Sequence, residues 1–482
     1  MKVIYNANLI DKNTNLRGFI VLENEKIIAV EQHNAEKPAL EEIKNAIKKS
    51  AAANSTDTSP DEKLFSSLTT SDITYTDANS LTVMPAFIDM HAHFRYPGQP
   101  QKEDLDSGLA AAANGGFGTL VLMPNTNPVI SSREQALAVM NEAREKKMSN
   151  IFQTTSITKD FGGTDTAHIT KLDRENFPVI TEDGHDVLST DVMLDGMKKA
   201  GANGIIVSCH SEDPELAVKA RTYRQNALKL MKEYNIPAWG IVPDGLQVPQ
   251  KIYDEIQTNL EQANELLRTA EDTFTERNLL LAEKADCRVH IAHVSTKGSI
   301  DFVREAKKKA ASLSKKYMVS CEITPHHLAL TGTKIPEIFA LVNPPLRSET
   351  DRRSLIEALR DGTADTISTD HAPHTADDKA AGSPGFTGSE TAFAVCNTVL
   401  VKQEGFTLNK LSELMSANAA EILGLKKGLL KPGYDADLVL VAPDEKWTVR
   451  AAEFKSKGKA SPFEDKELTG KVKSLYIGGR KI

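Results

Sequence analysis

The sequence predicts an α/β fold: an eight-stranded (β/α)8 TIM barrel with a small β-sandwich domain built from the two ends of the chain. Two observations predict the barrel. Short apolar runs recur along the middle of the chain, and helix-like segments follow them. A third observation predicts the added domain, because strand-like segments without an intervening helix occupy both ends. The length of 482 residues suits one barrel of roughly 250 residues or more with something attached.

Eight apolar runs are the expected barrel strands, and the fourth and eighth are short. They span residues 83–88, 119–123, 151–157, 179–180, 204–207, 288–291, 318–323 and 366–367. The expected helices between them include residues 134–147, 191–199, 254–285 and 351–360. Alternation of strand and helix over such a length is typical of a parallel barrel.

The domain boundaries follow from changes in composition. We expect residues 1–80 and 428–482 to form the composite β domain and residues 81–427 to form the barrel. Residues 35–77 are polar and rich in Ala, Ser, Thr and Lys, which predicts a solvated insertion in the β domain. Residues 217–276 are too long for one crossover, which predicts a helical insertion in the barrel.

The composition excludes several classes of partner. Lys and Arg number 58 against 66 Asp and Glu, so the net charge of -8 argues against nucleic acid and anionic membranes as partners. No run approaches the ~20 apolar residues of a membrane span, and the first residues lack a signal-peptide core. The four cysteines are scattered without a CxxC pair, which is typical of reduced thiols in a cytoplasmic protein.

Polar residues follow the apolar runs at the positions where a barrel carries its chemistry. Catalytic groups of such barrels lie at the carboxyl ends of the strands. The candidates there are four histidines and two aspartates: His91, His93, Asp183, His210, His293 and Asp370. Imidazole and carboxylate are the ligands that Zn²⁺ takes when no thiolate is present. We therefore expect these side chains to meet at a metal site.

His91 and His93 form an HxH pair. Residues i and i+2 of an extended strand point to the same side, so both rings can face one ion. Alone, such a pair more often packs or hydrogen-bonds than binds metal, and a single histidine after an apolar run is usually a satisfied polar group. The conjunction of six potential ligands at the ends of five predicted strands favours the metal site.

Seven segments carry a resemblance to a known family. They are PAFIDMHAHFR at residues 85–95, KED at 102–104, GGF at 115–117, MPNTNP at 123–128, HIAHVST at 290–296, VNPPLR at 342–347 and TDHAPH at 369–374. In this order they resemble the class I dihydroorotases of the amidohydrolase superfamily. The resemblance implies a zinc-dependent cyclic amidohydrolase that interconverts dihydroorotate and N-carbamoyl-aspartate in pyrimidine biosynthesis.

The resemblance also implies roles for the candidate ligands. One Zn²⁺ would lie between His91, His93, Asp183 and Asp370, and a second between His210 and His293, with Asp183 bridging. Related hydantoinases and allantoinases bridge their metals with a carboxylated lysine, whereas ITEDG at residues 180–184 contains none. The sequence leaves open whether one or two metals bind, and whether Glu182 shares the role of Asp183.

The expected mechanism gives Asp370 a second role and adds a set of substrate-binding residues. Zinc lowers the pKa of a bound water towards ~7, and Asp370 would accept its proton and pass it to the departing ring nitrogen; the alternative for Asp370 is ligation alone. Arg95, two residues after His93, suits the substrate carboxylate, its alternative being an ion pair with a nearby acidic residue. The remaining substrate-binding candidates, matched by resemblance, are Asn125, Asn343 and His374.

Two other functions stay open. The chain could be another cyclic amidase, of the allantoinase or dihydropyrimidinase type, which the missing lysine and Arg95 disfavour. It could also be a non-catalytic scaffold for aspartate transcarbamoylase, which the complete ligand set disfavours. A small-molecule substrate is expected in either enzymatic case. The sequence is also compatible with a homodimer or a complex with aspartate transcarbamoylase.

Overall fold

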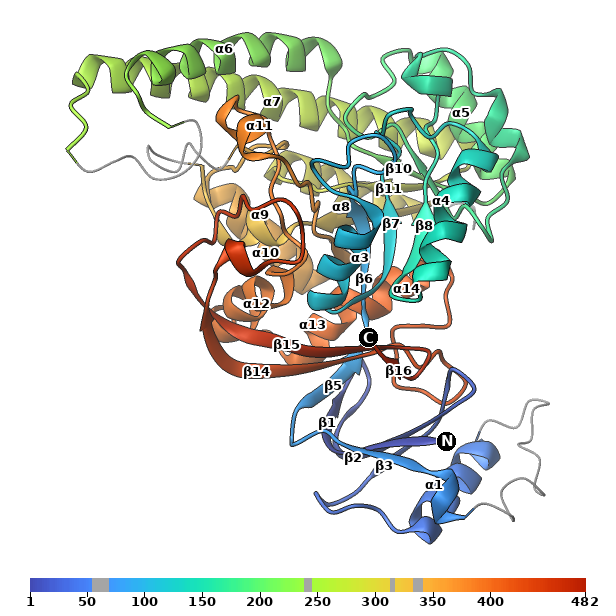
Figure 1. Ribbon diagram of the computed structural model, residues 1–482. Helices are drawn as coiled ribbons and strands as arrows, with labels where there is room; N and C mark the ends of the chain where they lie inside the picture. Colours follow the sequence, from blue (N-terminus) through green and yellow to red (C-terminus); the bar gives the residue numbers. More distant parts are fainter. Residues whose placement is uncertain (54–68, 238–244, 313–316, 333–340) are drawn as a thin grey trace.

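The structure is a computed structural model that describes residues 1–53, 69–237, 245–312, 317–332 and 341–482. It consists of an α/β barrel and a sheet that lies below it in Figure 1, where both ends of the chain meet. The predicted fold class is confirmed: parallel strands alternate with helices through the barrel, and strands from both termini share one sheet.

Eight parallel strands form the barrel, in two hydrogen-bonded groups of three and five. They are β6 (Phe87–Ala92), β7 (Phe117–Leu122), β8 (Asn150–Gln153), β9 (Val179–Thr181), β10 (Ile206–Cys209), β11 (Arg288–Ile291), β12 (Met318–Ile323) and β13 (Thr366–Ile367). The two groups meet on both sides. Thr181 N donates to Thr155 O at 3.1 Å beyond β8, and Ala92 forms a parallel bridge with His371 beyond β13. The ring of strands is therefore closed.

The first predicted strand is wrong, because residues 83–88 form parts of two strands. The strand β5 (Thr82–Pro85) pairs with β1 and β14 of the terminal sheet, and only β6 enters the barrel. The chain changes sheet at Ala86, whose N donates to Asp437 O. Both strands are buried along their length, so the apolar run continues across the break. Hydrophobicity alone cannot locate such a break.

Helices of the barrel begin with side-chain caps that their sequences supply. Ser132, Ser189, Thr296 and Ser348 each accept a hydrogen bond from a backbone N–H of the first turn. The helices are α3 (Leu105–Asn114), α4 (Arg133–Lys146), α5 (Thr190–Ala202), α8 (Lys297–Ala310), α9 (Pro325–Ala329), α10 (Glu349–Asp361), α11 (Ala376–Ala380), α12 (Ala392–Cys396), α13 (Leu408–Ser412) and α14 (Asn418–Leu423).

Two long helices occupy the region where the sequence predicts a helical insertion. The helices α6 (Pro214–Glu233) and α7 (Gln250–Ala285) pack together and extend past the barrel at the top of Figure 1. Small and apolar side chains such as Met231 and Ile256 fill the interface between them. The other end of α7 packs against α5 and α8, so the same helix forms part of the barrel wall.

The terminal sheet is ordered β16-β15-β14-β5-β1-β2-β3, and β4 pairs with β1. Its strands are β1 (Lys2–Ile10), β2 (Asn15–Glu23), β3 (Lys26–Gln32), β4 (Thr74–Asp77), β14 (Leu438–Thr448), β15 (Glu467–Ile477) and β16 (Arg480–Lys481). The N-terminal and C-terminal strands share a core that includes Ile4, Ile20, Leu438 and Tyr476.

Part of the expected solvated insertion is an amphipathic helix, so the prediction is wrong for that part. The helix α1 (Leu40–Ala53) buries Ile43, Ala46 and Ile47 against side chains such as Phe19 of the terminal sheet. Spacings of three and four residues place these side chains on one helical face. Residues 54–68 of the expected insertion lie outside the described residues.

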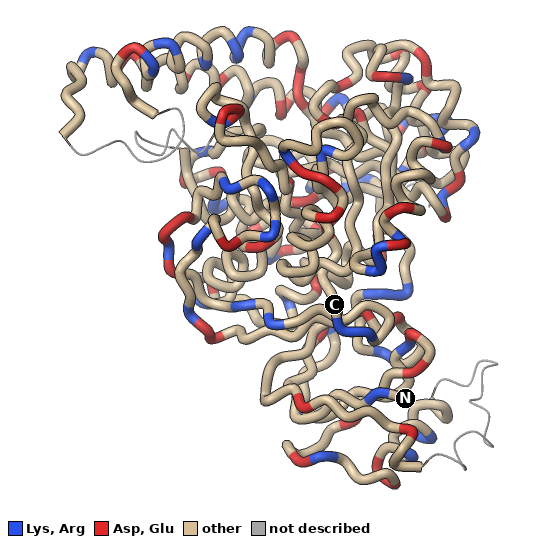
Figure 2. The backbone as a smooth tube through the Cα atoms, viewed as in Figure 1, with Lys and Arg blue, Asp and Glu red and all other residues tan. Residues whose placement is uncertain are grey.

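Basic and acidic residues are interspersed along the backbone in Figure 2. Among the helices that the structure describes, none is long and apolar enough to cross a membrane.

We predict that Ile43→Ala lowers the free energy of unfolding by about 2–5 kcal/mol, because it removes a fully buried side chain. Chemical denaturation followed by circular dichroism measures the change. The matched control is Lys48→Ala on the exposed face of α1. Equal stability of both variants would contradict the packed helix.

Candidate metal centre

The carboxyl ends of the barrel strands bring five of the predicted ligands together. His91 lies in β6 and His93 follows it, while Asp183, His210 and His293 lie just beyond β9, β10 and β11. They form two groups: His91, His93 and Asp183 in one, and Asp183, His210 and His293 in the other. Within each group the candidate ligand atoms lie within 4.8 Å of one another, and all five residues are buried.

Asp183 is the member that both groups share. Its Oδ1 lies 3.3 Å from His91 Nε2 and 3.8 Å from His293 Nε2, and its Oδ2 lies 3.6 Å from His93 Nε2. One carboxylate thus faces three imidazoles, two from the end of β6 and one from the end of β11. This is the arrangement expected of a bridging ligand.

Asp370, which follows β13, faces the group of His91, His93 and Asp183. Its Oδ1 lies 3.1 Å from His93 Nε2 and 3.6 Å from His91 Nε2. Its backbone N donates to His91 O, and the neighbouring Thr369 donates to the buried carboxylate of Asp89 through both N and Oγ1. The segment after β13 is therefore fastened to β6.

The backbone is strained at two of these positions. His293 has φ 30° and Asp370 has φ 47°, both in the left-handed region that residues with a Cβ atom rarely adopt. Strain of this kind persists where surrounding contacts impose it, and it gathers at functional sites.

Unpaired buried atoms test whether these residues fit a metal ion. His91 Nε2 and Asp183 Oδ1 are buried, and neither has a hydrogen-bond partner among the described residues. A buried polar atom without a partner costs roughly 1–3 kcal/mol. A divalent cation between the two atoms would satisfy both, and a set of imidazole and carboxylate donors suits Zn²⁺ and similar ions. The residues fit a metal.

The electrostatics agree with that fit. Burial opposes the charged form of Asp183, but His91, His293 and His93 outweigh it and hold the pKa of this carboxyl well below its usual value. Asp370 behaves in the same way. Burial tends to raise the pKa of its carboxyl, but the contact with His93 outweighs burial and the pKa is lowered. Both carboxylates are therefore anionic in a buried site, which favours a compensating cation.

Two carboxylates that the sequence analysis missed orient the candidate ligands. Glu322 Oε1 lies 3.1 Å from His91 Nδ1, and Asp186 Oδ2 lies 2.7 Å from His210 Nδ1. Each accepts the proton of one ring nitrogen and leaves Nε2 for the metal. Burial works against charging His210, but Asp186 outweighs it and raises the pKa of His210 to about 10 in the absence of a metal.

A weak sequence signal marked both missed residues. Glu322 is the one charged residue of the predicted strand at residues 318–323, and Asp186 follows Asp183 by three residues. A charge in a buried strand needs a partner. The sequence did not indicate which partner.

Glu182 is turned away from the ligand groups. Its Oε2 accepts from the backbone N–H groups of Ile157 (2.7 Å) and Thr158 (2.9 Å), and its Oε1 accepts from the Thr158 hydroxyl. Burial raises the pKa of Glu182 to about 7. The side chain thus fixes the segment after β8, and neither ligand group contains it.

Arg95 and His374 meet at the mouth of the barrel. Arg95 Nη2 lies 3.3 Å from His374 Nε2, and Arg95 Nε donates to Pro373 O at 3.4 Å. The prediction that Arg95 continues the extended strand of His93 is wrong, because β6 ends at Ala92 and Arg95 has a left-handed φ of 53°. The extended backbone does not persist to Arg95, and its neighbours determine its position.

Asn125 and Asn343 have contacts other than those expected for substrate-binding residues. Asn125 Oδ1 lies 2.9 Å from His93 Nδ1, and its Nδ2 donates to Asp183 Oδ2 at 3.0 Å, so it orients two candidate ligands. Asn343 Nδ2 donates to Glu212 Oε2 at 2.7 Å, just beyond β10. Asn343 Oδ1 is buried and has no partner within the described part of the chain.

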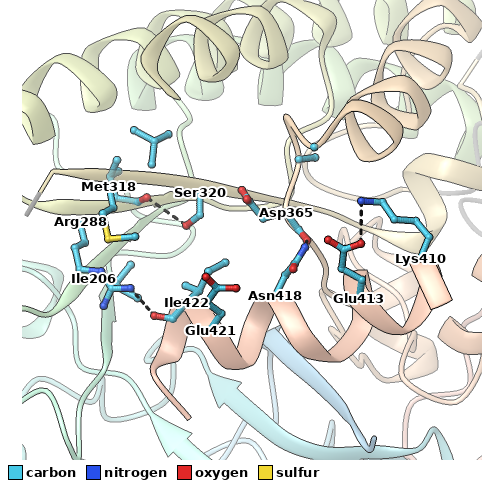
Figure 3. A pocket seen from close by; sticks show the side chains of 14 residues that line it. Ile206, Arg288, Met318, Ser320, Asp365, Lys410, Glu413, Asn418, Glu421 and Ile422 are labelled. Atoms are coloured by element: carbon cyan, nitrogen blue, oxygen red, sulfur yellow. Dashed lines mark hydrogen bonds and ion pairs between the residues drawn. The ribbon is translucent and has the colours of Figure 1, made fainter. Parts of the chain in front are cut away.

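A separate pocket of about 290 Å³ lies at the other end of the barrel strands (Figure 3). Residues at the amino ends of β10, β11 and β12 line it, together with α14. Its charged groups are largely engaged in protein contacts: Arg288 donates to Ile422 O, and Lys410 pairs with Glu413. Residues at this face of a barrel serve stability rather than catalysis.

We predict that the adjacent carboxyls Asp183 and Glu182 differ in their effect on metal content. Asp183→Asn should lose most of the bound metal, because both ligand groups contain it, whereas Glu182→Gln should retain it. Elemental analysis of the purified variants measures this. Metal loss from Glu182→Gln alone would contradict the arrangement described.

Comparisons with known proteins identify the family of the chain. The amidohydrolase family model matches residues 82–482. A dihydroorotase of Clostridium botulinum (strain Eklund 17B / Type B) is 37% identical over 399 residues, covering 83% of this chain and 86% of the relative. A dihydroorotase of Elusimicrobium minutum (strain Pei191) is 35% identical over 486 residues, covering 99% and 96%.

Among solved structures, an L-hydantoinase (dihydropyrimidinase) from Arthrobacter aurescens matches with a TM-score of 0.74 and 22% identity, covering all of this chain and 95% of that one. A dihydropyrimidinase from Brevibacillus agri matches with a TM-score of 0.72 and 19% identity, covering 100% and 94%. At these identities the likeness concerns the fold. With the family match over most of its length and dihydroorotases as its relatives, the chain belongs to the amidohydrolase family and is a cyclic amidohydrolase.

Proposed function

We propose that the protein is a zinc-dependent dihydroorotase, which reversibly hydrolyses the ring amide of dihydroorotate to N-carbamoyl-aspartate. The observation that carries the proposal is the pairing of Arg95 with His374. Both residues lie within four positions of candidate ligands, Arg95 after His93 and His374 after Asp370, and these two ligands contact each other. Dihydroorotate bears a carboxylate, and a guanidinium recognises a carboxylate by charge-assisted hydrogen bonds. The dihydroorotase relatives support the same substrate.

Asp370 is the proposed proton carrier. Its carboxylate stays ionised, so it can accept the proton of the attacking water as the oxygen bonds to the ring carbonyl carbon. The same carboxyl then gives that proton to the ring nitrogen as the C–N bond breaks. Zn²⁺, when bound, supplies Lewis acidity. The residues that would hold it are His91, His93, Asp183, His210, His293 and Asp370.

We assign substrate binding to polar side chains near the carboxyl ends of the barrel strands. Arg95 would bind the carboxylate, with His374 beside it. Asn343 Oδ1, buried and without a described partner, is available to a ring N–H. Asn125 would act mainly by holding His93 and Asp183, since its amide already contacts both.

The other candidate functions have less support. A hydantoinase-type activity is suggested by the solved structures, but these show the fold alone. The shared ligand here is Asp183 rather than a lysine, and Arg95 anticipates an acidic substrate. A non-catalytic scaffold would have no need for six assembled ligands.

The direct test is a substrate screen on the purified, zinc-loaded protein. We expect turnover of dihydroorotate and N-carbamoyl-aspartate in both directions, with little turnover of hydantoin, dihydrouracil or allantoin. Preference for one of the uncharged or non-acidic rings would overturn the proposal.

For Asp370→Asn we expect kcat to fall by about 10²–10⁴-fold, because the amide cannot carry the proton. Asp370 is in neither ligand group, so metal content should fall less than in Asp183→Asn. The circular dichroism spectrum should remain close to that of the parent. A variant that keeps both its metal and its activity would remove Asp370 from the mechanism.

For Arg95→Met we expect KM for dihydroorotate to rise by about tenfold or more, because the charge-assisted hydrogen bonds to the substrate carboxylate are lost. Steady-state kinetics measures it, and Arg144→Met on the exposed surface of α4 is the control. An unchanged KM in Arg95→Met would exclude the carboxylate contact.

A further inference from the structure

A buried carboxylate on α7 contacts the segment that follows β11. Glu271 is 4% exposed, and its Oε1 accepts from Ser295 N at 2.9 Å and from Thr296 N at 3.0 Å. Its Oε2 accepts from the Ser295 hydroxyl. These residues follow the candidate ligand His293 by two and three positions, so α7 fastens the backbone that carries this ligand.

Arg347 completes the contact from another segment. Its guanidinium is 3.1 Å from Glu271 Oε2, and the side chains of both residues are at most 5% exposed. Arg347 Nε also donates to Ser295 Oγ at 2.9 Å, and Nη1 donates to Asn264 O of α7 at 2.9 Å. Arg347 ends the VNPPLR segment, four residues after Asn343.

We propose that the Glu271–Arg347 ion pair is a positioning device, through which α7 fixes His293 and Asn343 relative to each other. The pair joins three segments that sequence separates: the insertion helix, the ligand-bearing end of β11 and the segment that carries a substrate contact. The geometry gives α7 a role in the site, although neither Glu271 nor Arg347 lies in a candidate ligand group.

The form of the contact distinguishes positioning from general stability. Glu271 accepts from consecutive backbone N–H groups, so it constrains the course of the chain rather than one side chain. Residues that orient a metal ligand typically change metal affinity by 10–100-fold when they are replaced. Glu271 acts through the backbone of His293, so we expect an effect at the lower end of that range.

The test uses Glu271→Gln, which keeps the shape and removes the charge. A single replacement leaves Arg347 buried without its counter-ion, so the double variant Glu271→Gln/Arg347→Gln is measured beside it as a neutral pair. Two quantities are read: Zn²⁺ retention by the holoenzyme in competition with a chelator, and KM and kcat with Zn²⁺ in excess. Both variants should hold Zn²⁺ about tenfold more weakly and show a raised KM, with kcat changed by less than about threefold.

Arg268→Gln is the matched control. Arg268 lies one turn from Glu271 on α7 and forms an ion pair with Asp351 at 2.6 Å, a residue of α10. This variant should alter thermal stability but leave Zn²⁺ retention and KM unchanged. Normal zinc retention and KM in folded Glu271 variants, or an equal loss in Arg268→Gln, would overturn the proposal.

The KM measurement rests on the proposed dihydroorotase function, whereas zinc retention does not. Failure of the parent enzyme to turn over dihydroorotate would therefore refute the proposed function, and zinc retention would still decide the positioning role.

Discussion

The arrangement of the site depends on one buried carboxylate, Asp183, which faces three imidazoles from two other strand ends. An ionised carboxylate in a closed interior is costly unless a cation compensates it. Hydrogen bonds do not complete this compensation, because Asp183 Oδ1 and His91 Nε2 face each other without a described hydrogen-bond partner. The fold thus brings together groups whose charges and unpaired atoms fit a metal ion.

The barrel stabilises this unfavourable cluster through contacts behind it. Glu322 and Asp186 fix the far nitrogens of two histidines, and Glu271 holds the backbone beyond a third. The left-handed backbone of His293 and Asp370 shows that these contacts outweigh local preference. The geometry of the candidate metal centre therefore also depends on carboxylates outside the two ligand groups. Replacing residues that orient a ligand in this way typically weakens metal binding by about 10–100-fold.

The sequence could predict much of this because the barrel has a simple spatial rule. Residues that follow parallel strands meet at one rim, so His210 and Asp370 could be placed together although 160 residues separate them. Helices were predictable where their apolar spacing was regular, as in the predicted helix at residues 254–285, which lies within α7.

Other features depend on contacts that no local pattern encodes. The partnership of Glu322 with His91 arises only when β12 closes near β6, and the change of sheet at Ala86 is hidden in an apolar run that is buried on both sides. The sequence left the choice between Glu182 and Asp183 open, because β9 ends at Thr181 and strand alternation no longer applies. The amphipathic face of α1 was visible in Ile43 and Ile47 but was outweighed by the polar composition around it.

The central claim is that a metal ion lies against Asp183 and the imidazoles around it. Anomalous diffraction at the zinc absorption edge, from a crystal of the zinc-loaded protein, measures this most directly. The account predicts a strong peak about 2.0–2.2 Å from His91 Nε2, His93 Nε2 and an Asp183 oxygen. Absence of a peak there, with zinc bound elsewhere or not at all, would contradict it.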